Sequence, residues 1–193
     1  PIDVVSGRTI DVPASFGPNG LHVIFLKFLV ALFNWGLLIW KLFGDDDIAF
    51  ILAYWTNIAL LLICLYTAFS LFNSIVSVRQ PREGEVVSAR VRWTWFFFNL
   101  AEHAGLIASL LYWPLDFDPA KFTWNGKGIR AILAHGPNTL FCCIDGLVVN
   151  RIPIRLFHWW SMLLPVNAAY FGWTLLHSYL GIGNPNPQVR MEE

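Results

Sequence analysis

Thr56, His135 and His177 are the side chains of this sequence whose types and positions could carry out nucleophilic chemistry. A histidine beside a hydroxyl group can take the hydroxyl proton, so that the oxygen attacks a carbonyl carbon. Thr56 would then be the nucleophile and His135 the base, while His177 or Asn138 would orient the base or stabilise the oxyanion. All of them lie in apolar stretches, where polar and ionisable groups are costly and often functional.

The composition indicates a polytopic membrane protein. Charged residues make up 13% of the 193 residues and hydrophobic residues 56%, whereas a soluble domain carries roughly 25% charged residues. The apolar content excludes a disordered chain. The formal net charge is zero, so the chain has no basic excess with which to bind nucleic acid.

Apolar stretches long enough to cross a bilayer predict an all-α transmembrane bundle over residues 21–181, with five spans and a sixth left open. Pro137 and Pro165 fall inside the last two stretches, and we expect them to kink those helices. One polar tail precedes the bundle at residues 1–20, and another follows it at residues 182–193. The stretches are Leu21–Phe43, Ile48 to about Val78, about Ala89 to Trp113, Arg130–Asn150 and Ile154–Leu180.

Five spans would place the N-terminal tail, the loop at residues 79–88 and the turn at residues 151–153 on one face of the membrane, called side A below. The opposite face is side B. With the flanking residues included, side A carries seven Lys and Arg and side B carries five. This excess predicts that side A, with the N-terminus, faces the cytosol or the mitochondrial matrix.

Depth along the helices, at a rise of 1.5 Å per residue, sorts the buried polar residues into two layers. Thr56, His135 and His177 all fall within about 12 Å of side B. The same layer contains three residues that we expect to bind substrate or lipid: Asn57, Asn138 and Thr139.

The second layer lies near side A. Asp145 and His158 have matching depths there, and we expect them to form a structural polar pair. Small hydroxyl side chains share one face of the second stretch, where the expected role is to hold helices together. They are Thr67, Ser70, Ser74 and Ser77.

The histidines and acidic residues do not predict a metal or haem site. His135 and His177 share a depth, but no second histidine pair lies one leaflet away on the same helices. Glu102 and His103 are adjacent and so point about 100° apart on a helix, and neither H-x-x-H nor E-x-x-H occurs. We therefore expect no metal or cofactor, and only bound phospholipids.

Several motifs follow one another along the chain in an order that matches a known family. They are Y-W-T-N around Thr56, R-W-T-W to L-Y-W at residues 92–113, A-H-G-P-N-T-L-F-C-C-I-D-G with His135 and Asp145, R-I-P-I-R-L-F-H ending at His158, and A-Y-F-G-W-T-L-L-H ending at His177. From residue 56 to residue 185 the chain resembles the androgen-induced and rolling-stone family of multispanning membrane proteins.

This resemblance implies a lipid-ester hydrolase. Some members of the family are intramembrane threonine hydrolases that act on fatty-acid esters of hydroxy fatty acids. Thr56 would correspond to their nucleophile and His135 to their essential histidine. The rolling-stone branch is instead associated with membrane fusion and development.

The two polar tails favour a different function. Neither has an apolar core of its own, so we expect partner proteins on both membrane faces to hold them. On this interpretation the chain is an accessory subunit of a larger membrane complex, of the respiratory or ATP-synthesising kind, on a hydrolase-like bundle that binds lipid. The mitochondrial inner membrane is then favoured over the endoplasmic reticulum and the plasma membrane. We favour this interpretation over the hydrolase, because a shared fold does not determine function.

Overall fold

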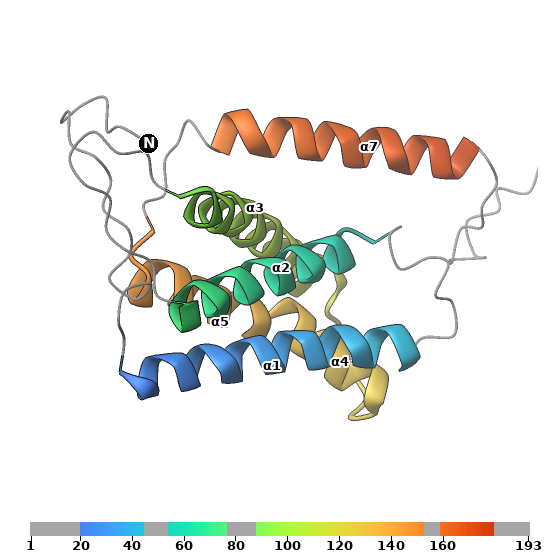
Figure 1. The fold of residues 1–193 in the computed structure, drawn as a ribbon. Coiled ribbons are helices and arrows are strands. Elements are labelled where there is room, and N and C mark those ends of the chain that lie inside the picture. Colours follow the sequence, from blue (N-terminus) through green and yellow to red (C-terminus); the bar gives the residue numbers. More distant parts are fainter. Residues whose placement is uncertain (1–19, 45–53, 77–87, 153–158, 180–193) are drawn as a thin grey trace, which may run out of the picture.

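The computed structural model describes residues 20–44, 54–76, 88–152 and 159–179. Within these ranges every regular element is a helix and none is a strand (Figure 1). The α-helices and the short π-helices, written η, are α1 Leu21–Gly44, α2 Trp55–Val76, α3 Ala89–Leu111, η3 Tyr112–Asp116, α4 Gly126–His135, α5 Pro137–Cys143, η4 Ile144–Val149, η5 Trp159–Leu163 and α7 Leu164–Tyr179.

Three helical stretches are long and apolar enough to cross a membrane: Leu21–Gly44, Trp55–Val76 and Gly126–Val149. The third is made of α4, α5 and η4 in succession. A helix of about 20 residues already spans the hydrocarbon core of a bilayer. The chain therefore has the helices of a membrane protein. Two further helices are not among these three stretches: α3 carries several polar residues, and α7 has only 16 residues. The predicted count of five spans therefore stays a prediction.

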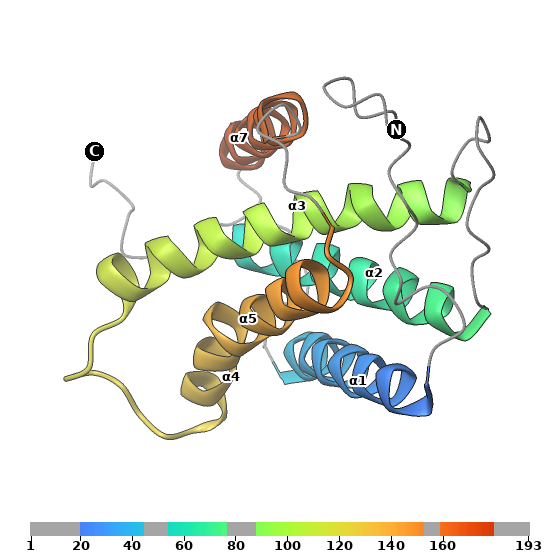
Figure 2. The ribbon, with the colours of Figure 1, turned by 90° about the vertical axis from the view of Figure 1, so that its left-hand side faces the viewer.

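The helix α2 lies in the middle of the bundle and packs against both α1 and α3. In both ribbon views α7 lies beyond α3, on the opposite side of the bundle from α1 (Figures 1 and 2). The largest apolar cluster joins α2, α3 and the α5–η4 segment, and it includes Ile63, Tyr66, Trp95, Phe98 and Cys142. A second cluster joins α1, α2 and α4 through Leu37, Leu38, Leu60, Cys64 and Ala134.

Two glycines allow the α5–η4 segment to lie close against α3. A β-carbon on Gly105 of α3 would come within 2.8 Å of Thr139 Oγ1 on α5, and a β-carbon on Gly146 of η4 would overlap the ring of Phe98 on α3. This close approach fixes η4 beside α3 and so determines the direction of Asp145, which precedes Gly146.

The helix break at Gly136 is the kink that Pro137 was expected to produce. The helix α4 ends at His135, and α5 begins at Pro137, because the residue before a proline disfavours helical dihedral angles. Pro165 has a different setting. It is the second residue of α7, directly after the change from the π-helix η5 to an α-helix, and a proline inside a helix removes one backbone hydrogen-bond donor.

Candidate functional site

A buried cluster of polar side chains lies where α1 begins and η4 ends, which is the side-A end of the bundle. The helix α1 contributes Lys27, α2 contributes Tyr66 and Ser70, and the η4 region contributes Asp145 and Asn150. None of the five is more than 4% exposed. We call them the lysine–aspartate cluster.

Hydrogen bonds connect all five members of the lysine–aspartate cluster. Lys27 Nζ donates to Asn150 Oδ1 at 2.6 Å and to Ser70 Oγ at 3.0 Å, and it lies 4.0 Å from Asp145 Oδ1. Asp145 Oδ2 accepts three hydrogen bonds, from Tyr66 OH at 2.7 Å, from Ser70 Oγ at 2.7 Å and from Asn150 Nδ2 at 3.0 Å. Asn150 Nδ2 also donates to Tyr66 OH at 2.7 Å.

This arrangement suits a buried ion pair. A charge removed from water is tolerated when an opposite charge and further hydrogen bonds compensate it. The charges of Lys27 and Asp145 cancel. The hydroxyls of Tyr66 and Ser70 and the side-chain amide of Asn150 form hydrogen bonds with the two charged groups. The cluster therefore fixes α1, α2 and η4 relative to one another.

The end of η4 positions Asn150 in the cluster. The N–H of Asn150 donates to Asp145 O at 2.8 Å, and that of Ile152 donates to Gly146 O at 2.9 Å. Between them Arg151 has a φ of 52°, the left-handed conformation that commonly ends a helix. The helix thus stops directly after Asn150, and the side chain of Asn150 folds back onto the Asp145 carboxylate.

The predicted polar pair at this end of the bundle stays a prediction, because His158 lies outside the described residues. Its other member, Asp145, is buried among polar side chains. Ser70 does hold helices together, as expected of the hydroxyl face, and it does so through Asp145. The prediction missed Lys27, Tyr66 and Asn150. A lysine seven residues into an apolar stretch, at the depth of Asp145, was the available signal.

In the predicted catalytic layer, the described contacts of His135 are with Ala108 and Tyr112 and not with Thr56. His135 Nδ1 lies 3.3 Å from the carbonyl oxygen of Ala108, and its ring stacks on Tyr112 with 3.9 Å between the centroids and 8° between the planes. Thr56, the second residue of α2, is half-buried and is not among the described partners of His135. The structure therefore holds the imidazole through α3 and η3, not through Thr56.

The other described residues predicted for that layer are bonded in two separate groups. Asn57 accepts a hydrogen bond from Lys41 Nζ at 2.6 Å. Asn138 Oδ1 accepts from the backbone N–H of Thr139 at 2.7 Å, and Thr139 Oγ1 lies 3.3 Å from Ser109 Oγ. His177 belongs to α7, but its side chain is outside the described part of the structure. The described residues of the layer do not converge on one point.

Glu102 and His103 correct one expectation. Adjacent helical residues were expected to point apart, yet Glu102 Oε2 lies 2.8 Å from His103 Nδ1, and both side chains are buried in α3. His103 Nδ1 also contacts the carbonyl oxygen of Asn99 one turn earlier. Among the described residues, no group of three or more His, Cys, Asp and Glu could hold a metal ion.

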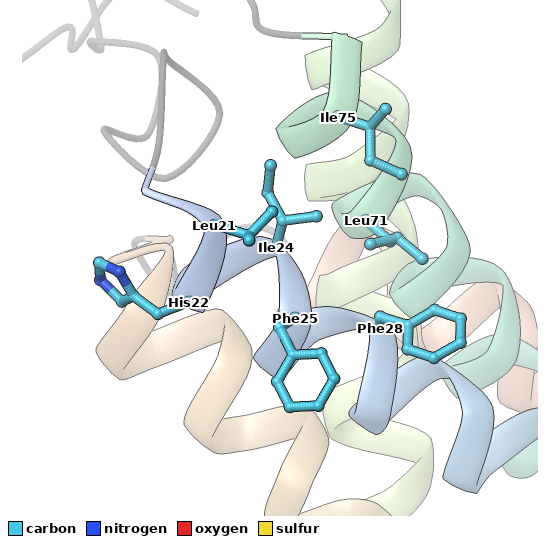
Figure 3. Close-up of a pocket in the computed structure, with 7 residues that line it drawn as sticks. All are labelled: Leu21, His22, Ile24, Phe25, Phe28, Leu71 and Ile75. Atoms are coloured by element: carbon cyan, nitrogen blue, oxygen red, sulfur yellow. The ribbon is translucent and has the colours of Figure 1, made fainter.

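An apolar hollow lies between the first turns of α1 and the last turns of α2. Its volume is about 530 Å³, and Figure 3 shows its seven lining residues. His22 is the polar one among them, and it points away from the others in Figure 3. The side chains that line the interior are therefore aliphatic and aromatic, which suits an apolar occupant and offers no catalytic group: Leu21, Ile24, Phe25, Phe28, Leu71 and Ile75.

Comparison of the chain with protein-family models, with characterised proteins and with solved structures finds no match. The resemblance to the androgen-induced and rolling-stone family therefore stays a prediction from the motifs.

Proposed function

We propose that this protein is a structural subunit of a larger membrane protein complex, held in the bilayer by its helix bundle. The observation that carries the proposal is the exposure of α7. None of the described side chains of α7 is buried, although the helix consists mainly of apolar residues. Its described ring contact with α2 is that of Tyr170 on Trp55, with centroids 4.9 Å apart.

Exposed apolar side chains of α7 lie on opposite faces of the helix. Phe171 is 65% exposed and Trp173 is 41% exposed. Residues two apart in a helix differ by about 200° in direction, so these two side chains do not belong to one stripe. A helix that is apolar around its circumference needs apolar surroundings on more than one side. Within the part of the chain that the structure describes, little covers α7, and helices of partner subunits would hold it in place.

The interior of the bundle supports the same proposal. The ion pair of the lysine–aspartate cluster is neutral overall and bonded internally, which is what a rigid scaffold requires. The imidazole of His135 is held by a backbone carbonyl and an aromatic ring. For the host, the proposal names a respiratory or ATP-synthesising complex of the mitochondrial inner membrane, with the N-terminus in the matrix. Purification from the native membrane in a mild detergent tests the proposal, and we expect a defined set of other membrane proteins to co-purify.

One observation favours a lipid-ester hydrolase as a second candidate function. Leu60 lies one helical turn after Thr56, and Ala134 immediately precedes His135, and both belong to one buried apolar cluster. Thr56 and His135 are therefore on neighbouring helices at a similar level. A change in the direction of either side chain would be needed to form the nucleophile and base pair.

A Thr56→Ala variant separates the two candidates. Because Thr56 is not bonded to His135, we expect the wild-type protein and Thr56→Ala to show the same background labelling by a fluorophosphonate probe and no turnover of fatty-acid esters. The control is Thr174→Ala, because the described hydrogen bond of the Thr174 hydroxyl goes to Tyr170 O of its own helix. The hydrolase would be established by labelled, active wild-type protein whose turnover falls about 10³-fold or more in Thr56→Ala and is unchanged in Thr174→Ala.

A further inference from the structure

A groove of about 330 Å³ lies between α1 and the α5–η4 segment. Seven of its eight lining residues are apolar, and the eighth is Asp145. Leu29 and Ile144 are 43% and 41% exposed, so the groove opens on the outer face of the bundle. In a membrane that face meets lipid.

The groove has one polar end. The ring centroids of Phe33 on α1 and Phe141 on α5 are 5.2 Å apart, and these residues lie toward the middle of the two helices. Asp145 lies four residues before Val149, the last residue of η4, which is about 6 Å along the helix axis. The carboxylate is therefore near the membrane surface, and the two phenylalanines lie deeper.

Asp145 keeps the capacity to accept another hydrogen bond. All three of its described hydrogen bonds go to Oδ2. Oδ1 receives none among the described residues and has Lys27 Nζ 4.0 Å away as its ionic neighbour. A carboxylate oxygen in apolar surroundings gains stability from a donor at hydrogen-bond distance. A ligand in the groove could supply that donor.

The chemistry of the lining restricts the ligand. An ammonium group would be repelled by Lys27, which already neutralises Asp145. The ester carbonyls of a diacylglycerol or the amide of a ceramide would enter surroundings that offer no further polar side chain, at a desolvation cost. A ligand with one uncharged hydroxyl group on an otherwise apolar body avoids both the repulsion by Lys27 and the cost of burying further polar groups. A rigid body also loses less conformational entropy on binding than a flexible chain does.

We propose that this groove binds a sterol, with its hydroxyl donating to Asp145 and its ring system lying along α1 and α5 toward Phe33 and Phe141. The proposal goes beyond the role as a subunit and does not depend on it. The site is distinct from the predicted layer of Thr56 and His135, which belong to α2 and α4 and lie toward the other end of the bundle.

Photolabelling of the intact chain in phosphatidylcholine nanodiscs tests the groove. The probe is a photoactivatable sterol with a free hydroxyl group. Leu29→Trp fills the groove from a half-exposed position, and we expect its labelling to fall about tenfold or more. Leu140→Trp, on an exposed position of α5 outside the lining, should label as the wild type does. Ile144→Trp serves as a second blocking variant if Leu29→Trp does not fold. Equal labelling of a folded blocking variant and the wild type overturns the proposal.

Competition on the wild-type chain tests the hydroxyl contact without altering the lysine–aspartate cluster. Unlabelled sterol should displace the probe, and the same sterol with its hydroxyl methylated should compete about tenfold less well or worse, because it cannot donate to Asp145. Equal competition by the two compounds shows that the carboxylate does not recognise the ligand, and the proposal then fails.

Discussion

Replacement of Lys27 by methionine is expected to reduce the free energy of unfolding by about 3–5 kcal/mol. Methionine keeps most of the volume of the side chain and removes the ammonium group. The Asp145 carboxylate would remain buried beside Tyr66, Ser70 and Asn150 without its counter-ion. Removal of one partner of a buried ion pair is costly for this reason, whereas the intact pair itself can contribute little net stability.

The measurement is reversible unfolding of the purified protein in detergent micelles, with the double variant Lys27→Met/Asp145→Asn as its comparison. In the double variant no net charge is left unpaired, so most of the lost stability should return. Lys121→Met is the surface control, because Lys121 is exposed and its partner Asp118 is half-exposed at 3.1 Å, and such pairs contribute little. A Lys27→Met protein as stable as the wild type would contradict the structural role of the cluster.

The second large effect is expected at Gly146. In Gly146→Ala the new methyl group would occupy space that the fully buried ring of Phe98 now fills. Forcing extra atoms into a packed core typically costs about 1–3 kcal/mol. We expect the upper part of this range, because η4 would have to move away from α3 and Asp145 would move with it.

Two further variants separate overpacking from the general effect of an alanine in a helix. Gly36→Ala introduces a methyl group with no atom within 4 Å, and in a helix interior it should stabilise the protein by about 0.5–1 kcal/mol. Gly146→Ala combined with Phe98→Leu should recover part of the lost stability, because the smaller side chain leaves room. Equal thermal stability of Gly146→Ala and Gly36→Ala would show that the helices do not approach as closely as described.

The lengths of the apolar stretches predicted the bounds of two helical segments to within a few residues. The first stretch was expected at Leu21–Phe43 and is found at Leu21–Gly44. The fourth was expected at Arg130–Asn150 and is found as the broken helix Gly126–Val149. These bounds follow from the local sequence, because a bilayer requires long apolar helices. The break at Pro137 follows from local sterics as well.

Contacts between polar residues were harder to predict, because depth along a helix does not give rotation about its axis. Trp55 donates from Nε1 to Ala104 O of α3 at 3.2 Å, and Asn57 bonds Lys41 of α1. The residues on either side of Thr56 thus contact different helices. The partners of Trp55 and Asn57 depend on how all the helices of the bundle pack together, and the sequence of one apolar stretch does not predict that packing.

Lys27 was missed for a related reason. A lysine near the end of a span is normally expected to extend its side chain to the membrane surface. Here the ammonium group lies inside the bundle at 1% exposure, because Asp145 and Asn150 on another helix lie at the same depth. The sequence contains all three residues, but only the packed helices bring them together.

Photo-crosslinking from α7 in the native membrane tests the central proposal most directly. A benzophenone amino acid replaces Phe171, which is 65% exposed, and Trp124, which is 81% exposed between η3 and α4, serves as the control position. If the chain is a structural subunit, position 171 crosslinks to one defined membrane protein, and the protein mass of the particle purified in mild detergent exceeds that of one chain. Lipid adducts alone at position 171, together with a monomeric particle, would contradict the proposal.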